Sequence, residues 1–428
     1  MDQRTLPVDN DMIESTTPKT RAAVIFIFIT LMLDVLAMGV VIPVLPKLIA
    51  GFMHGERADA VRIGGLISLV WAAMQFICTP IQGALSDHFG RRPVLLLSMT
   101  GLGLDYVLMA LAPNLTWLFI ARIISGATAA SFGTANAYIA DITPPEKRPA
   151  AFGMMGAAFG IGFIVGPALG GFAGSFDARL PFWVAAALSL LNALYGYFIL
   201  PESLPPERRA KFSLARANPV GAFKLLGSNV RLAGLATAQF FYMVAHNVYP
   251  AVFVWFTMYR YGWNERSNGL ALALFGATSI IVQGGLVGPV VKYLGTRRSL
   301  ITGLLFGIAG FAIYAIGPTD LSVWIAIPIA SLWGFYNPAA QTLMTQQVNS
   351  SQQGQLQGAL GSLMGIAAII SPPLYTNIFA AAIDLKAQVS AGTPILGAPF
   401  FVACLLLSCA LVVCLRVMRR VTSSAVAR

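Results

Sequence analysis

The chain has 428 residues, of which 57% are hydrophobic and only 11% are charged. Because soluble globular proteins carry about 25% charged residues, this composition excludes an ordinary soluble domain and indicates a protein that crosses a membrane many times. The formal net charge of +11 does not indicate a nucleic-acid partner, because the basic residues lie in short loops between apolar runs and not on one solvated face.

The four cysteines all lie inside apolar runs and lack the spacing of metal ligands, so we expect no disulfide, no metal site and no cofactor. The first 21 residues are polar, unlike a cleavable signal with a basic start and a short apolar core. We therefore expect membrane insertion to begin with the first retained span.

Twelve apolar runs follow one another along the chain, each about long enough to cross a hydrocarbon core roughly 30 Å thick as a helix. They lie at 22–46, 64–86, 93–112, 115–140, 150–174, 181–199, 231–256, 268–291, 298–317, 321–345, 354–379 and 394–417. The sequence therefore predicts an all-α polytopic membrane protein with twelve transmembrane helices and both termini on one side. Of the lysines and arginines, 20 lie on that side and 7 on the other, so the positive-inside rule predicts cytoplasmic termini.

The longest predicted cytoplasmic loop, 200–230, is polar and rich in proline, and it divides the spans six and six. An offset of 205 residues superposes landmarks of the two sets, as expected for two parallel six-helix halves. The landmarks are Gly90 with Gly295, Arg92 with Arg297, Gly153 with Gly358 and Pro167 with Pro372. The predicted organisation is a tail at 1–21, a bundle at 22–199, the linker at 200–230, a bundle at 231–417 and a tail at 418–428.

The loop between spans 2 and 3 is short, charged and set between two long apolar runs. Its residues with turn or charge chemistry are Gly83, Asp87, Gly90, Arg91 and Arg92. Span 4 ends at the same face with Asp141, at a depth where Arg91 would reach it. Ion pairs are worth more at a partly dry interface than in water. We therefore predict that Asp87, Arg91 and Asp141 form a latch that favours the state shut on the cytoplasmic side; the alternative is that the loop only anchors the topology. At the 205-residue offset Lys292 replaces Asp87, so the two halves are not equivalent.

Ionisable side chains deep in the spans are costly unless paired or hydrated, so each is a candidate functional residue. Asp105 in span 3 and Arg122 in span 4 both lie roughly 10 to 12 Å below the same surface, so a pair is expected, with either a functional or a purely structural role. Asp34 in span 1 has no evident partner at its depth. A carboxyl group in an apolar environment takes up a proton more readily than one in water, so Asp34 is the first candidate for proton coupling.

Polar side chains in several spans are suited to line a cavity for a large amphipathic ligand, together with nearby aromatic residues. The candidates are Gln75, Gln239, His246, Asn247, Gln283, Asn337 and Gln341. Scattered glutamine and asparagine residues also hold membrane helices together, so we expect only a subset to contact substrate. A single histidine in an apolar helix, such as His246, is more often a packing residue than a proton relay.

Span 5 is rich in glycine and contains one proline. The residues concerned are Gly156, Gly160, Gly166, Pro167, Gly170 and Gly171. Glycines four residues apart let another helix approach closely, and a proline inside a helix removes a backbone hydrogen bond and permits a kink. Ordinary glycine-mediated packing is the alternative to a role in transport.

These motifs resemble those of a known family. The pattern G-x-L-x-D-x-x-G-R-R at 83–92 resembles the signature between spans 2 and 3 of major facilitator superfamily transporters, and the span 5 glycines resemble the signature of that superfamily's antiporters. Further strings make the chain similar to the twelve-span drug:proton antiporters of the tetracycline-efflux group. They are Leu33 to Gly39, Pro43 to Pro46, Asp105-Tyr106, Arg122-x-x-x-Gly126, Tyr138 to Thr143, Leu200 to Ser203 and Gly354 to Gly358.

The resemblance implies the major facilitator fold and assigns roles to residues. It implies that Asp34, Asp105 and Arg122 act in coupling or substrate handling. It also implies gating by Asp87 and Arg91, and antiport by Pro167 with its glycines.

Two positions depart from the pattern of the tetracycline exporters. Those proteins carry an acidic residue in span 9 and a histidine in span 8, where this chain has Gly307 and Ser279. The second half has therefore lost carboxylate chemistry. The departure predicts either a substrate other than a metal–tetracycline chelate or a proton path confined to the first half.

We therefore expect proton-driven export of an amphipathic small molecule across a bacterial inner membrane. The expected partners are the substrate, protons and the lipid bilayer, with no nucleic acid, and we expect the protein to act as a monomer. The alternative is uptake or facilitated diffusion of a nutrient or metabolite. A membrane enzyme or receptor is disfavoured, because the sequence holds no nucleophile–base pair, phosphate-binding loop or metal cluster.

Overall fold

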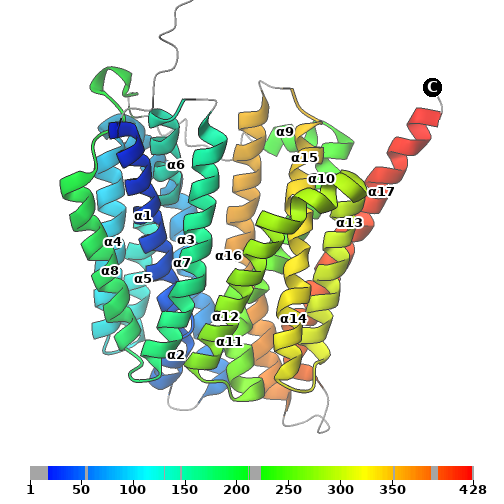
Figure 1. The fold of residues 1–428 in the computed structure, drawn as a ribbon. Coiled ribbons are helices and arrows are strands. Elements are labelled where there is room, and N and C mark those ends of the chain that lie inside the picture. The colour runs from blue at the N-terminus through cyan, green and yellow to red at the C-terminus, as the bar shows by residue number, and fades with distance from the viewer. Residues whose placement is uncertain are drawn as a thin grey trace, which may run out of the picture.

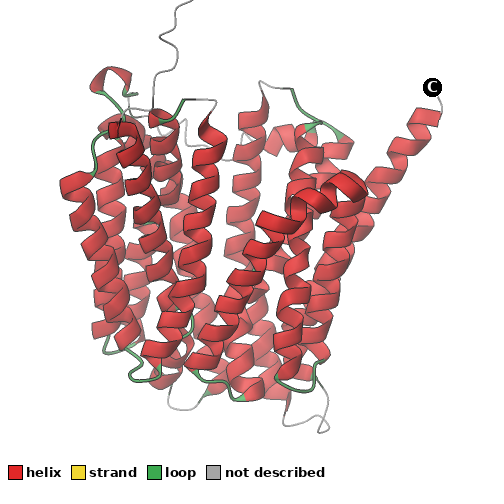
Figure 2. Ribbon diagram, viewed as in Figure 1, coloured by secondary structure: helices red, strands yellow, loops and turns green. Residues whose placement is uncertain are grey.

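The structure is a computed structural model that describes residues 18–53, 56–129, 131–144, 147–210, 212, 223–349, 352–386 and 394–426. Across these ranges the regular secondary structure is helical and no strand is present, as Figure 2 shows. The predicted all-α fold is therefore confirmed. Residues 1–17 of the predicted first tail and 213–222 of the predicted linker lie outside the described residues.

Proline, glycine and asparagine set several helix ends before the linker. Pro46 lies in the first turn of its helix, where a missing N–H removes no helical hydrogen bond. Gly90 has a φ of 108°, which ends one helix and lets the next begin at the following residue. Asn114 caps a helix by accepting a hydrogen bond from the backbone N–H of Trp117. The helices are α1 (Pro18–Val41), α2 (Leu45–Phe52), α3 (Arg57–Phe89), α4 (Arg91–Leu111), α5 (Leu115–Thr128), α6 (Ser131–Ile142), α7 (Arg148–Gly174) and α8 (Leu180–Ile199).

After the linker the helices are more often interrupted. They are α9 (Phe223–Gly227), α10 (Val230–His246), α11 (Val248–Tyr261), α12 (Glu265–Ile280), the π-helix η6 (Ile281–Leu286), α13 (Val287–Ile316), α14 (Leu321–Ser331), the 3₁₀-helix η7 (Leu332–Phe335), α15 (Tyr336–Thr345), α16 (Gln353–Lys386) and α17 (Ala398–Val426). Gly295 bends α13 with a φ of 77°. Short 3₁₀ turns, η3 (Pro206–Arg208) and η9 (Ile395–Gly397), complete the described elements.

Nine helical stretches in the described part of the chain are long and apolar enough to cross a membrane. One of them, Glu265–Ile316, contains two predicted spans, because the helix bends back at Gly295 without a break in its hydrogen bonding. Predicted spans 7 and 10 fall short of the required length because each is divided, into α10 and α11 and into α14, η7 and α15. The described residues of the twelve predicted spans are thus mainly helical, and these interruptions were not predicted.

The helices pack into two groups. In the first group, α1 packs on α7 and α8, and α3 and α4 pack on α5; in the second group, α10 and α13 pack on α17, and α12 packs on α14. The groups meet where α7 contacts α12 and where α3 contacts α16. In Figure 1 the first group runs from blue to green and the second from green to red.

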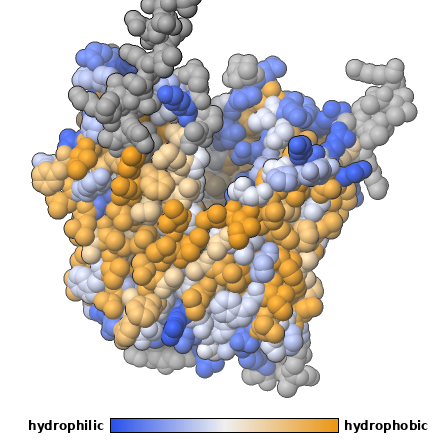
Figure 3. All heavy atoms as spheres, in the orientation of Figure 1, coloured by the Kyte–Doolittle hydropathy of each residue, from blue (hydrophilic) through white to orange (hydrophobic). Residues whose placement is uncertain are grey.

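The surface divides into an apolar middle and two polar ends. Figure 3 shows hydrophobic residues in a broad belt, with hydrophilic residues gathered above and below it. This is the distribution expected of a protein whose middle lies in hydrocarbon. We call the end that carries Gly90 and Gly295 the terminal face, because α1 begins and α17 ends there, and the other end the distal face (Figure 1).

The two groups touch in the distal part and separate toward the terminal face. A Cβ atom added at Gly160 of α7 would lie 2.7 Å from Ile280 of α12, whereas one added at Gly156, one turn away on the same side, would meet no atom within 4 Å. On α16, Gly365 abuts a phenylalanine of α3, while Gly361 faces open space. Figure 3 shows the molecule hollowed between the groups at this face. The structure therefore contains a cleft that opens at the terminal face.

The π-helix η6 begins at the residue that follows this last contact of α12 with α7. Gly284 and Gly285 lie within it, and a Cβ atom added at either would meet nothing within 4 Å. A π-helical turn inserts extra backbone into an α-helix and changes its direction. In Figure 1, α12 and its continuation lean away from α7 toward the terminal face. The π-helix thus marks where the cleft widens.

Candidate functional site

Arg91 is the centre of a charged cluster at the terminal face. Its Nη1 atom donates to Asp87 Oδ1 at 2.5 Å and to Ser86 Oγ at 2.7 Å, and its Nε atom donates to Asp141 Oδ2 at 3.1 Å. The Arg91 side chain is only 11% exposed, whereas that of Asp87 is 53% exposed. The cluster joins the ends of α3, α4 and α6. Its three predicted members therefore lie together, and Asp87 keeps one side open to water.

Glu202, directly after α8, completes this cluster. Its carboxylate accepts hydrogen bonds from the backbone N–H groups of Arg91 at 2.8 Å and Arg92 at 3.3 Å, the unpaired donors at the start of α4. A side chain at Gly90 would collide with that carboxylate. Ser203 Oγ also donates to Asp141 Oδ2 at 3.1 Å. The segment from Leu200 to Ser203 entered the prediction only as part of the family resemblance, and no role was predicted for Glu202.

All these partners belong to the first group of helices. In the described part of the chain no hydrogen bond or ion pair joins the cluster to α9–α17. Arg92 points to a different partner, since its Nη2 donates to the backbone oxygen of Tyr197 at 2.6 Å. Gly83 faces open space. A latch that shuts the terminal face therefore stays a prediction about a state other than this one.

Three ionisable residues predicted for coupling lie near one another inside the first group. Arg122 Nη2 donates to Asp105 Oδ2 at 3.2 Å, and Asp105 is fully buried. Tyr106, the neighbour of Asp105, lies within electrostatic range of Asp105, Arg122 and Asp34. Helices α1, α4 and α5 thus bring one buried charged region together.

The expectation that Asp34 lacks a partner is wrong. Asn192 of α8 donates from its Nδ2 atom to Asp34 Oδ1 at 3.1 Å and to the backbone oxygen of Thr30 at 3.0 Å. Asp34 is 4% exposed. Residue spacing along the chain does not show which face of α1 meets α8, so the sequence analysis did not find Asn192.

The predicted polar lining gathers mainly in the second group, where α10, η6 and η7 are interrupted or irregular. The His246 ring lies 4.4 Å from the Trp333 ring between centroids, and His246 is exposed. Gln239 Nε2 donates to Asn337 Oδ1 at 3.2 Å. Asn247 instead bonds the backbone of its own helix, through Nδ2 to the oxygen of Met243.

The remaining predicted lining residues are dispersed. Gln283 lies exposed in η6 near Gly334 of η7, and Gln341 is exposed one turn beyond Asn337. Gln75 belongs to α3 of the first group and shares no hydrogen bond with the others. One predicted lining residue, His246, belongs to a compact aromatic cluster, which we define as Tyr242, His246, Tyr249, Trp333 and Tyr336.

The two positions that depart from the tetracycline-exporter pattern belong to the second group. A Cβ atom added at Gly307 would lie 2.8 Å from the Leu407 side chain and 3.4 Å from Trp333, so this part of α13 is packed against α17 and η7. Ser279 lies in α12, just before η6. Neither position supplies a carboxylate or an imidazole.

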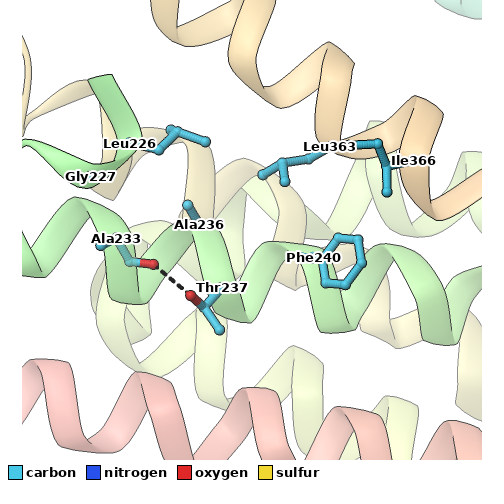
Figure 4. A pocket seen from close by; sticks show the side chains of 8 residues that line it. All are labelled: Leu226, Gly227, Ala233, Ala236, Thr237, Phe240, Leu363 and Ile366. Carbon is cyan, nitrogen blue, oxygen red and sulfur yellow. Dashed lines mark hydrogen bonds between the residues drawn. The ribbon is translucent and has the colours of Figure 1, made fainter. Parts of the chain in front are cut away.

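An apolar pocket of about 420 Å³ lies between α9, α10 and α16. Figure 4 shows Phe240 on α10 below Leu363 and Ile366 on α16, with Leu226 at the end of the pocket and the Thr237 side chain directed away from α16. The Thr237 hydroxyl donates to the backbone oxygen of Ala233 at 2.8 Å, so little polar chemistry faces inward. This pocket is suited to an apolar part of a ligand and was not predicted.

Ion pairs join the two groups at the distal face. Lys47 of α2 contacts Glu265 of α12 at 2.6 Å, and the Glu265 side chain is only 10% exposed. Arg62 of α3 contacts Asp384 of α16 at 2.6 Å, where both side chains are partly exposed. Arg57 lies over the Tyr259 ring at 5.7 Å. The sequence analysis used these cations only to predict topology and missed their partners, because all three partners come from the other half.

The span 5 glycines contact helices of both groups. The backbone of α1 occupies the space beside Gly166 and Gly170, and a side chain at either would overlap it. A side chain at Gly171 would instead overlap the backbone oxygen of Glu265 in α12, and Gly269 abuts the same turn. Close approach therefore requires glycine on both sides of α7, one of the two helices of the first group that pack on the second group.

The fold and the site define a membrane transporter built from two helical halves around a one-sided cleft. The sequence profile described as Major Facilitator Superfamily matches residues 27–372. The chain belongs to the major facilitator superfamily, whose fold is twelve helices in two halves.

The relatives agree with this assignment. The chain is 38% identical to the tetracycline resistance protein, class C, of Escherichia coli, over 90% of this chain and 96% of that protein. It is 34% identical to the class B protein of Escherichia coli, over 81% of this chain and 86% of that protein. Among solved structures, a bacterial homolog of the human lysosomal transporter Spinster has a TM-score of 0.76 at 18% identity, covering 95% of this chain and 98% of that one. That likeness concerns the fold alone.

Proposed function

We propose that this protein exports an amphipathic small molecule in exchange for protons by alternating access. The one-sided cleft is the observation that supports this most directly. It is open at the terminal face, while α7 with α12 and α3 with α16 close the distal face. Transport by rocking two halves requires a path that opens to one side at a time. Because the relatives are tetracycline resistance proteins, tetracycline is the first substrate to test.

We infer that the terminal face is cytoplasmic and that the membrane is a bacterial inner membrane. The excess of lysine and arginine on the terminal side supports this orientation. Both termini are then cytoplasmic, and an exporter would load its substrate in the state described here. The two halves of a single chain enclose the cleft, which supports a monomer as the working unit.

The two halves supply different kinds of side chain. The buried charged residues Asp34, Asp105 and Arg122 all lie in the first group, whereas the aromatic cluster and the apolar pocket lie in the second group. Gly307 leaves the second half without a carboxylate at the position where tetracycline exporters carry one. The proposal therefore places proton exchange in the first half and the larger part of substrate contact in the second.

Purified protein in liposomes with an imposed pH gradient tests this function. Efflux by antiport requires labelled tetracycline to move against the direction of the protons and to stop when an ionophore removes the gradient. Flux that is unchanged by the gradient would favour facilitated diffusion, and substrate moving together with protons would favour uptake. Either result would contradict the proposal.

Asp34→Asn tests the assignment of the proton site. Asparagine has the size and shape of aspartate, and its amide oxygen can still accept the hydrogen bond from Asn192. The amide does not take up or release a proton at neutral pH. We expect tetracycline binding within about twofold of wild type, and gradient-driven transport reduced on the order of a hundredfold, as for removal of an essential proton-transfer group. Asp177→Asn, in an exposed loop of the same half, is the matched control and should transport normally. Active transport by Asp34→Asn would remove Asp34 from the coupling role.

A further inference from the structure

The turns at Gly90 and Gly295 occupy equivalent places in the two halves but carry different electrostatics. Both glycines have positive φ, 108° and 77°, and both turns connect consecutive spans at the terminal face. Around Gly90 the arginines are held by Asp87, Asp141 and Glu202. The turn at Gly295 replaces this arrangement with cations alone, namely Lys292, Arg297 and Arg298, all exposed.

The cations of the Gly295 turn have no acidic partner among the residues that the structure describes. None of the three forms an ion pair in the described part of the chain. The sequence itself explains this, because after Glu207 it contains only three acidic residues. These are Glu265, Asp320 and Asp384, and they lie at the distal ends of α12, α14 and α16. Among the residues that the structure describes, the terminal face of the second half therefore carries cations and no carboxylate.

A fourth cation lies at the same depth. Gly307 of α13 packs against Leu407 of α17, and the two helices run in opposite directions from that contact. Arg297 is ten residues from Gly307 and Arg416 is nine residues from Leu407, so both lie about 14 to 15 Å toward the terminal face at 1.5 Å per residue. Arg416 is exposed and also unpaired in the described residues.

The turn also presents an aromatic side chain at the edge of the apolar belt. Tyr293 is 83% exposed, more than any other large hydrophobic side chain in the described part of the protein. Its neighbours Lys292 and Leu294 are exposed as well. Tyrosine beside lysine and arginine is a combination found where membrane proteins meet lipid headgroups. The ring lies at the boundary between headgroups and acyl chains, and the cations attract the phosphate groups. Figure 3 shows hydrophilic residues gathered above the apolar belt over this half.

We propose that the Gly295 turn, with Lys292, Tyr293, Arg297 and Arg298, binds the phosphate headgroup of anionic phospholipids in the leaflet at the terminal face. Arginine and lysine donate charge-assisted hydrogen bonds to phosphate oxygens, and no carboxylate in the described ranges pairs with these cations. The corresponding turn of the first half should bind such lipids less strongly, because Arg91 is held by Asp87 and Asp141 and Arg92 donates to the backbone oxygen of Tyr197. The site does not depend on which substrate the protein transports.

The experiment compares phosphatidylglycerol with phosphatidylcholine on detergent-purified full-length protein, with bound lipid counted by native mass spectrometry. We expect wild type to retain phosphatidylglycerol in preference to phosphatidylcholine. The triple variant Lys292→Gln, Arg297→Gln, Arg298→Gln should weaken phosphatidylglycerol binding on the order of a hundredfold, since each cation near an anionic surface contributes about a factor of five. Inorganic phosphate at millimolar concentration should not displace the lipid, because it lacks the acyl chains that contact Tyr293.

The control variant Lys147→Gln, Arg208→Gln removes exposed cations from the terminal face of the first half. It should bind phosphatidylglycerol like wild type. An equal loss in this control would show that net charge alone attracts the lipid, and unchanged binding in the triple variant would also overturn the proposal.

A charge-retaining variant guards against misfolding or inverted insertion of the triple variant. Lys292→Arg, Arg297→Lys, Arg298→Lys keeps every positive charge and should retain lipid binding. The single variant Lys292→Gln should lose about fivefold without disturbing insertion. If Lys292→Gln, Arg297→Gln and Arg298→Gln each bind phosphatidylglycerol like wild type, the site is wrong whatever the fate of the triple variant.

Discussion

The terminal and distal faces use the same kind of ion pair for different purposes. At the terminal face Arg91 binds Asp87 and Asp141 within one half, whereas at the distal face Lys47 binds Glu265 across the two halves. A pair within a half moves as one body when the halves rock, so it can persist in every state. A pair between halves must break whenever the distal face opens. We therefore expect the cost of opening the distal face to come from the distal pairs, while the terminal cluster holds the first half together.

The largest expected effects come from filling the helix contact between the halves. Gly171→Leu places a side chain where α12 already lies, so the distal face cannot close. Gly156→Leu, on the same helix, fits the open cleft but blocks closure of the terminal face. We expect both variants to lose transport. Gly171→Leu should leave the cleft accessible from the distal face, and Gly156→Leu should leave it accessible from the terminal face. A cysteine in place of Thr376, which is buried at the distal contact, should react with a water-soluble maleimide faster in Gly171→Leu and slower in Gly156→Leu.

This experiment uses a protein whose four natural cysteines are replaced by alanine. The background protein itself should show intermediate labelling at position 376. Equal labelling in the two leucine variants would mean that the contacts of α7 do not control the two faces separately. The idea that different contacts close the terminal and distal faces would then be wrong.

Much of the fold was predictable from composition and periodicity. Apolar runs of about 20 residues predict helices in a bilayer, and even the weak repeat of Gly90 on Gly295 proved to mark turns of the same backbone conformation. The interruption at Asn247 was not predictable, because it depends on a neighbouring helix: the Tyr375 hydroxyl of α16 donates to the backbone oxygen of Val244. The interruptions at η6 and η7 were not predicted either.

The site was predictable only where its members are close in sequence or have matching depths. Asp105 and Arg122 lie on neighbouring spans at equal depth, so their contact follows from helix geometry. Asn192 beside Asp34 and Glu265 beside Lys47 depend on which helix faces meet across the bundle. A single sequence does not show which helix faces meet, and this is why the distal pairs were not predicted.

The second largest effect is expected for Arg91→Ala, a loss of stability. The change removes three hydrogen bonds of a guanidinium that is only 11% exposed; such charge-assisted bonds contribute about 1.5 to 3 kcal/mol when shielded and less at Asp87, which is 53% exposed, so we expect a loss of about 2 kcal/mol. Thermal unfolding in detergent should show a clearly lower midpoint. Arg92→Ala is the control, since Arg92 mainly contacts a backbone oxygen at the exposed side of α8. A wild-type midpoint for Arg91→Ala would show that the cluster does not hold the half together.

A smaller effect is expected from the buried distal pair. Lys47→Gln leaves Glu265, which is 10% exposed, without its cation in the closed state, while the open state hydrates it. We expect the closed state to lose about 1 to 2 kcal/mol, less than for a fully buried pair because Lys47 is half exposed. Cysteine labelling at position 376 should therefore accelerate roughly 5- to 30-fold under conditions where opening is rapid and labelling limits the rate.

The charge-reversed double variant Lys47→Glu, Glu265→Lys is the matching control for that pair. It restores an ion pair of opposite direction and should return labelling toward the background rate. If position 376 in the double variant is labelled as fast as in Lys47→Gln, the closed distal face depends on the packing of Lys47 and Glu265 and not on the attraction between their charges.

The smallest effect provides the sharpest test, because Arg62 takes part in both kinds of pair. It contacts Asp59 within its own helix at 2.5 Å and Asp384 of the other half at 2.6 Å, and the two carboxylates are similarly exposed, at 49% and 52%. Exposed pairs contribute about 0.2 to 1 kcal/mol, so Asp384→Asn should raise labelling at position 376 by no more than about fivefold. Asp59→Asn should leave labelling unchanged, because its pair persists in both states. Equal acceleration by the two variants would mean that the position of a pair, within a half or between halves, does not decide its effect on the transport cycle.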